Sequence, residues 1–189
     1  MIYLVYGGSG SGKSSFAESL LSGFDSTHKY YIATMKVRPD DADAQKKITR
    51  HKQMRAGKGF LTIECPVNLD GLTLSAGDGA SAGGTGAGSA SSALLECMSN
   101  LCANEMFDTA DGVPKSPEEV SVKIISGINH LAELFGNLII VTNNIFEDGI
   151  EYNETTRAYM DALSKINCKL AAMADKVYEV VAGIPLELK

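Results

Sequence analysis

Residues 7–14, GGSGSGKS, decide the fold, because they satisfy the pattern G-x-x-x-x-G-K-[ST] at every fixed position. A β-rich run at residues 2–6 precedes them, and apolar residues at helical spacing follow as far as Gly23. Glycines let the backbone N–H groups turn inward, and the start of the next helix adds partial positive charge. A Gly/Ser-rich turn that only joins strand to helix is the alternative, but it does not require Lys-Ser after the last glycine. The sequence therefore predicts a phosphate-binding loop.

Strands and helices alternate along the rest of the chain. The sequence predicts further strands at residues 30–34, 60–64, 93–97, 138–142 and 177–182, with an added edge at 186–189. It predicts four further helices. They cover residues 40–55, the segment from the strand at 93–97 to Phe107, the segment from Ser116 to Gly136, and residues 159–173. This alternation predicts an α/β fold of the P-loop NTPase type, with a mainly parallel sheet and helices on both faces. We expect one domain over residues 1–189.

A low-complexity tract interrupts this pattern at residues 75–92, which are Gly, Ala, Ser and Thr with one Asp. Such a composition cannot bury enough apolar surface to offset the entropy of ordering it. We expect a flexible surface insertion with no chemistry of its own.

The composition limits the partners and the compartment. The 189 residues carry a net charge of −6, which argues against nucleic-acid binding, and no segment is apolar enough to span a membrane. The four cysteines form no C-x-x-C pair, so neither a zinc site nor a redox motif is indicated. Free thiols indicate a reducing cytoplasm.

Phosphate chemistry needs a cation and a metal beside the loop. Lys13 would reach the β- and γ-phosphates of a nucleoside triphosphate, and the Ser14 hydroxyl would ligate Mg²⁺. Glu96, at the end of a predicted strand, is the candidate for the second metal-binding group. The alternatives are that Glu96 caps the next helix or faces solvent, and that Glu147 or Asp148 supplies the carboxylate.

A histidine lies among cations on the predicted helix at residues 40–55. Lys47, His51 and Arg55 follow at intervals of four, which places them on one helical face, and Lys52 flanks that face. A neutral imidazole could attack the α-phosphorus of a triphosphate and expel pyrophosphate. On spacing alone, a plain solvated face is the favoured interpretation.

In their order along the chain, these segments resemble the bifunctional adenosylcobinamide kinase / adenosylcobinamide-phosphate guanylyltransferase family of cobalamin biosynthesis. The resemblance covers nearly the whole chain except the low-complexity tract. It rests on residues 7–14, 31–34, 48–55, 62–64, 94–97, 141–143, 170–175 and 180–184. It implies a RecA-like P-loop fold, a homotrimer, and GTP, ATP and adenosylcobinamide as substrates.

The resemblance also implies roles for single residues. His51 would accept GMP from GTP and pass it to adenosylcobinamide phosphate, and Ser14 and Glu96 would hold Mg²⁺. The implied nucleotide contacts are Gly8, Ser9, Gly10, Ser11, Gly12, Lys13, Ser14, Ser15, Thr34, Met35, Lys36, Lys52, Gln53, Met54, Arg55, Glu64 and Glu96.

The chain departs from the family pattern at several positions. Lys47 replaces an arginine, Ala56 replaces a proline, Phe60 stands for a tryptophan, and Asn144 stands where the family favours glutamate. The chain thus carries the guanylyltransferase pattern more completely than the kinase pattern. Two alternatives stay open: a small-molecule kinase with no covalent step, which would not need His51, and a non-catalytic nucleotide-binding regulator.

Overall fold

All the predicted strands are present, and they lie in one sheet. A computed structural model describes residues 1–36, 57–74, 91–147 and 149–189. These residues form a seven-stranded sheet in the order β3-β2-β4-β5-β1-β6-β7, in which only the β6–β7 pair is antiparallel. The strands are β1 Ile2–Gly7, β2 His28–Ala33, β3 Leu61–Glu64, β4 Ser91–Glu96, β5 Asn137–Asn143, β6 Lys176–Val181 and β7 Ile184–Glu187.

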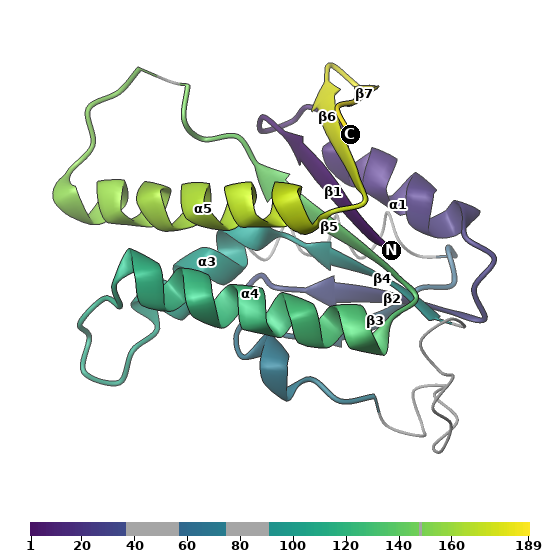
Figure 1. The fold of residues 1–189 in the computed structure, drawn as a ribbon, viewed down its shortest axis with the longest axis horizontal. Coiled ribbons are helices and arrows are strands. Elements are labelled where there is room, and N and C mark those ends of the chain that lie inside the picture. The colour runs from purple at the N-terminus through teal and green to yellow at the C-terminus, as the bar shows by residue number, and fades with distance from the viewer. Residues whose placement is uncertain (37–56, 75–90, 148) are drawn as a thin grey trace.

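Helices cover both faces of this sheet (Figure 1). The helix α1 packs on one face, and α3, α4 and α5 pack on the other. They are α1 Lys13–Gly23, α3 Met98–Phe107, α4 Pro117–Leu134 and α5 Glu154–Met173, with a 3₁₀ turn η1 at Leu69–Gly71. The predicted α/β architecture is therefore confirmed. The predicted helix at 40–55 lies outside the described residues, and the single domain over 1–189 stays a prediction.

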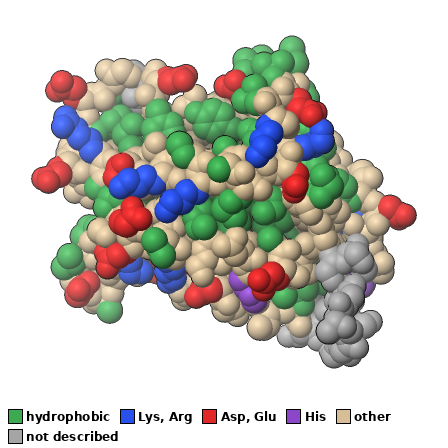
Figure 2. Space-filling view, viewed as in Figure 1, with side chains coloured by type: hydrophobic (Ala, Val, Ile, Leu, Met, Phe, Trp, Pro, Cys, Tyr) green, Lys and Arg blue, Asp and Glu red, His purple; other side chains and the backbone are tan. Residues whose placement is uncertain are grey.

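The surface above α3, α4 and α5 carries side chains of both charges, interspersed (Figure 2). Hydrophobic side chains gather at one end of the same view, over β6 and β7. No helix in the described part of the chain is long and apolar enough to cross a membrane.

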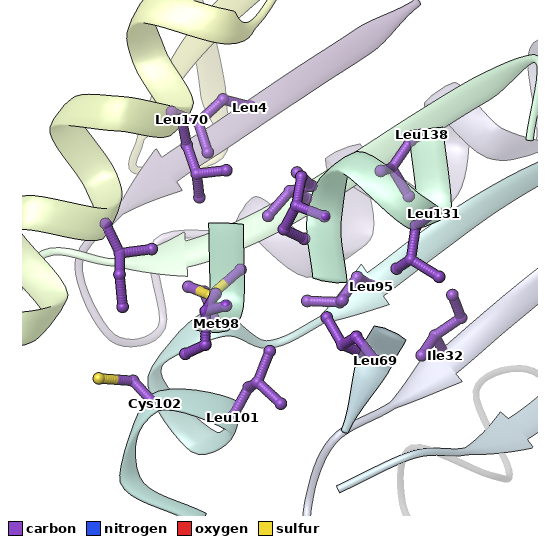
Figure 3. Close-up of a cluster of buried hydrophobic side chains, with 14 of the residues drawn as sticks. Leu4, Ile32, Leu69, Leu95, Met98, Leu101, Cys102, Leu131, Leu138 and Leu170 are labelled. Carbon is purple, nitrogen blue, oxygen red and sulfur yellow. The ribbon is translucent and has the colours of Figure 1, made fainter. Parts of the chain in front are cut away.

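Two apolar layers hold the helices to the sheet. The larger lies under α3, α4 and α5, and includes Ile32, Leu95 and Leu138 of the strands (Figure 3). The smaller lies under α1 and includes Leu94 of β4 and Leu21 of α1. Because β4 and β5 are covered on both faces, their side chains are apolar at successive positions rather than at alternate ones.

The start of β4 corrects one boundary of the sequence prediction. The predicted insertion ran to residue 92 and the strand from 93, but β4 begins at Ser91. Ser91 and Ser92 are buried. The Ser92 Oγ lies 2.6 Å from the Ser26 Oγ and accepts a hydrogen bond from the Asn137 Nδ2 at 3.1 Å. The polar side chain of Ser92 fits inside this central strand because it has hydrogen-bond partners there. Residues 75–90 lie outside the described part.

The last predicted edge strand is also shifted. It was expected at residues 186–189, whereas β7 spans Ile184–Glu187 and follows β6 through a tight turn. Ala182 and Gly183 both have positive φ in that turn, at 50° and 83°. A two-residue hairpin turn needs this conformation, and glycine adopts it without strain.

Candidate nucleotide site

The glycine-rich loop joins β1 to α1 at the carboxyl edge of the sheet. Gly12 has φ 93° and directly precedes the helix. A Cβ on Gly12 would lie 3.1 Å from the Cα of Gly183. Both the backbone conformation and the close approach of the hairpin therefore require glycine here.

Two other elements hold this loop in place. The Gly183 N–H of the β6–β7 turn donates to the Ser11 carbonyl at 2.8 Å. The Asn144 N–H, just after β5, donates to the Gly7 carbonyl at 2.9 Å. The loop is thus fixed from the β5 side and from the C-terminal hairpin, a pre-organised arrangement that suits a binding loop.

The Lys13 side chain lies in this loop rather than in solvent. It is 7% exposed, and its Nζ donates to the Gly8 carbonyl at 2.8 Å. Burial lowers the pKa of Lys13 below its usual value, and the nearby Cys97 and Glu96 partly counter this effect. A phosphate oxygen would be a stronger partner for this ammonium than the carbonyl is.

Glu96 ends β4 beside the start of α1. Its Oε1 accepts a hydrogen bond from the Ser14 hydroxyl, and its Oε2 accepts one from the Tyr31 hydroxyl at 2.9 Å. A hydroxyl and a carboxylate are the hard oxygen donors that suit Mg²⁺. Among the described residues no group of three or more His, Cys, Asp or Glu side chains could hold a metal. An Mg²⁺ bound with a nucleotide typically keeps several waters and takes only one or two ligands from protein carboxylates.

Glu147 is the rival carboxylate that the structure describes. Glu147 follows β5 and is exposed. Burial, Glu147 and Glu179 all raise the pKa of Tyr6. Glu147 thus lies close enough to Tyr6 for its charge to act on the phenol. Glu96 is the carboxylate that the fold brings to Ser14. Asp148 lies outside the described residues.

The segment after β2 also reaches this edge, because Ala33 pairs with Glu96. Thr34 is fully buried, and its Oγ1 accepts from the Cys97 N–H at 2.7 Å and donates to the Cys97 carbonyl at 2.8 Å. Met35 is half-buried, and the exposed Lys36 forms an ion pair of 2.5 Å with Asp108. The Thr34 side chain thus joins the segment after β2 to the segment after β4.

Glu64 lies farther out, at the end of the edge strand β3, where it pairs with Ala33. Of the loop residues 8–15, Ser14 is hydrogen-bonded to Glu96 and Lys13 lies within reach of its charge, whereas Glu64 is separated from β4 by β2. His51, Lys52, Gln53, Met54 and Arg55 lie outside the described residues, so their predicted roles stay predictions. Sequence reasoning missed Tyr31 and Gly183, because their contacts depend on strand order and on a distant turn.

Comparison with known proteins gives a consistent result. Residues 3–188 match the family described as cobinamide kinase / cobinamide phosphate guanyltransferase. The chain is 30% identical over 198 residues to the bifunctional adenosylcobalamin biosynthesis protein CobU of Escherichia coli, and 31% over 200 residues to that of Salmonella typhimurium, with all of each chain covered. It is 26% identical to the bifunctional adenosylcobalamin biosynthesis protein CobP of Pseudomonas aeruginosa, across 98% of this chain and 96% of the relative.

Proposed function

Because the chain belongs to the cobinamide kinase / cobinamide phosphate guanyltransferase family, we propose that it phosphorylates adenosylcobinamide and then joins GMP from GTP to that phosphate, giving adenosyl-GDP-cobinamide. One structural observation carries the proposal. The phosphate loop and the strand-end carboxylate of Glu96 meet through the Ser14 hydroxyl, as a metal–nucleotide site requires. The family match supplies the substrate class, which the loop alone does not indicate.

The kinase step is a transfer of the γ-phosphoryl group. The aminopropanol hydroxyl of adenosylcobinamide attacks the γ-phosphorus, the bond to the β–γ bridging oxygen breaks, and a nucleoside diphosphate leaves while the hydroxyl loses its proton. Lys13 and the loop N–H groups stabilise the phosphate oxygens by charge and position. Ser14 and Glu96 would hold Mg²⁺, which supplies positive charge next to the β- and γ-phosphates when bound.

The guanylyl step uses a covalent carrier. A ring nitrogen of His51 attacks the α-phosphorus of GTP, and pyrophosphate leaves with the bridging oxygen. A phosphate oxygen of adenosylcobinamide phosphate then attacks the same phosphorus and displaces His51. The sequence pattern around His51 supports this role, and Lys52 and Arg55 would steady the α-phosphate during the attack.

We also propose a homotrimer located in the cytoplasm. The apolar side chains of Val181, Ile184, Leu186 and Leu188 are 47–63% exposed around the open β7 edge, which supports a contact between copies (Figure 2). All four cysteines are free, which supports a reducing compartment. Light scattering of the purified protein would give three times the chain mass of 20.0 kDa if the trimer forms.

Covalent labelling tests the function. The protein is incubated with Mg²⁺ and GTP carrying a radioactive α-phosphate, and the wild type is compared with His51→Ala and His28→Ala. We expect an acid-labile, base-stable label on the wild type and on His28→Ala, and none on His51→Ala. His28 is a matched control because it begins β2, whereas Glu96 of β4 pairs with Ala33 at the other end of β2.

A second assay separates the two half-reactions. Transfer of the γ-phosphate of ATP to adenosylcobinamide is measured for the wild type and for Asn144→Glu, which restores the residue that the family favours. If the wild type takes up no label but still makes the phosphorylated product, the protein is a small-molecule kinase with no covalent step. If the wild type binds GTP but shows neither activity, the protein is a non-catalytic nucleotide-binding regulator.

A further inference from the structure

Tyr31 is a buried tyrosine that neither the loop motif nor the family pattern assigns to the site. It is 3% exposed and packs with Val5, Ala17 and Leu94 in the apolar layer under α1. A buried phenol hydroxyl is retained at little cost only when it has a partner, and here the Glu96 carboxylate is one.

The pleat of the sheet explains why the two side chains meet. Tyr31 pairs with Leu94 across β2 and β4, and Ala33 pairs with Glu96. Side chains two residues apart point to the same face, so Tyr31 and Glu96 both lie on the α1 side. Glu96 lies two residues farther along β4 than Leu94, the partner of Tyr31, and this diagonal separation is within reach of an aromatic side chain. The Tyr31 hydroxyl lies 2.9 Å from the Glu96 Oε2.

The carboxylate is therefore held at both oxygens by different elements, Ser14 of α1 at Oε1 and Tyr31 of β2 at Oε2. A hydroxyl has one proton and two lone pairs, so Ser14 can donate to Glu96 and still offer a lone pair to a metal. The direction of that lone pair depends on where Glu96 lies. Tyr31 fixes Glu96 from the side that Ser14 does not reach.

Resting on the proposed nucleotide function, we propose that Tyr31 is a positioning residue: its hydroxyl orients the Glu96 carboxylate, and through it Ser14, for the Mg²⁺ that accompanies a nucleoside triphosphate. In this role Tyr31 acts through Glu96, and not by contact with the nucleotide or the reacting atoms. Removing a hydrogen-bond partner of a metal ligand typically lowers metal affinity by about 10- to 100-fold. We expect a loss of Mg²⁺ affinity at the low end of this range for Tyr31, because Ser14 still holds Glu96.

Calorimetric binding of GTP across a series of Mg²⁺ concentrations tests this role in the wild type and in Tyr31→Phe. We expect Tyr31→Phe to bind GTP like the wild type in EDTA, and to need about tenfold more Mg²⁺ for the half-maximal gain in affinity. Saturating Mg²⁺ restores wild-type affinity. Tyr30→Phe is the matched control, since it removes the same hydroxyl from the next residue on the opposite face and leaves the Mg²⁺ dependence unchanged.

A double-mutant cycle shows whether Tyr31 acts through Glu96. In a Glu96→Gln background, Tyr31→Phe should add no further change in the Mg²⁺ dependence. A change of similar size in both backgrounds would overturn the proposal.

The remaining outcomes separate this inference from the proposed function. A wild type that binds GTP without any Mg²⁺ dependence removes the premise of both. A Mg²⁺-dependent wild type that Tyr31→Phe matches overturns the role of Tyr31 alone. A Tyr31→Phe chain that melts well below Tyr30→Phe and loses GTP binding in EDTA would make the hydroxyl a requirement of the fold, which also overturns the proposal.

Discussion

The carboxylate of Glu18 is buried on the inner side of α1 and has Lys58 as its ionic partner. The Nζ–Oε2 distance is 2.5 Å, and the side chains are 1% exposed for Glu18 and 40% for Lys58. Within the described residues, the buried Oε1 has no hydrogen-bond partner. We expect Lys58→Ala to lower the free energy of unfolding by about 2 kcal/mol, because it leaves the buried Glu18 charge unpaired. The loss is smaller than for a fully buried pair, since solvent around the exposed Lys58 weakens the ion pair in the wild type. Urea unfolding measures this.

The same pair predicts an asymmetry between its two partners. Glu18→Gln removes the buried charge and leaves Lys58 solvated, so it should cost less than Lys58→Ala. Adding Glu18→Gln to Lys58→Ala should recover part of the lost stability. Equal losses for both single variants, with no recovery in the double variant, would show that the charge is not the cause.

For single residues, the sequence can predict a role where that role follows from local spacing. Lys13 and Ser14 stand at fixed positions of the loop, and Glu96 ends an apolar run. The Glu18–Lys58 and Tyr31–Glu96 contacts span 40 and 65 residues. Such contacts depend on the order of strands in the sheet, which no local pattern specifies.

The helix α4 begins with a capping box formed by Ser116 and Glu119, with Pro117 in its first turn. The Ser116 Oγ accepts from the Glu119 N–H at 3.3 Å, and the Glu119 Oε2 accepts from the Ser116 N–H at 2.9 Å. The hydrogen bonds from the Ser116 side chain and backbone lower the pKa of Glu119. Stability from this carboxylate is therefore present above its unfolded pKa, and it is lost as the pH falls through the folded pKa.

Ser116→Ala tests this cap. We expect it to lower the free energy of unfolding by about 1 kcal/mol at neutral pH, and to lose less stability than the wild type on going to acid, because Glu119 has lost its largest hydrogen bond. Thermal unfolding followed at neutral and acidic pH measures the difference. Ser126→Ala, at an exposed position inside α4, is the control and should not be destabilising. A loss that is the same at both pH values would contradict the role of Glu119.

The boundaries of the elements show where pattern reasoning succeeds and where it fails. The cap of α4 was predictable because each group that it uses lies within four residues. The start of β4 was not, since Ser91 and Ser92 continue the composition of the preceding tract. The buried Ser92 hydroxyl has its partners on other parts of the chain, Ser26 and Asn137.

At the scale of the molecule, alternation of strands and helices predicted the layers but not the strand order. The parallel β1 lies between β5 and β6, and the C-terminal hairpin reaches the loop through Gly183. The first and last parts of the chain therefore build the site together. A truncation of the hairpin would act on the loop as well as on the sheet edge.

The described chain on each side of residues 75–90 is anchored to other elements of the fold. Before it, the Leu72 carbonyl lies 2.8 Å from the His130 Nε2, and Leu69 packs tightly against Gly127 of α4. After it, the Ser91 carbonyl accepts from the Gly136 N–H at 2.9 Å. We expect that cutting the tract to half its length changes the free energy of unfolding by less than about 1 kcal/mol and leaves GTP affinity unchanged, because loop-closure entropy varies slowly with length.

Thermal unfolding and GTP calorimetry on the shortened chain check this expectation. A deletion that also removes Ser91 and Ser92 is the matched control. It should unfold the protein, because it takes the first two residues from a central strand and leaves Asn137 without its Ser92 partner. A shortened chain that keeps Ser91 and still loses folded protein or GTP binding would show that the tract contributes to the core or to the site.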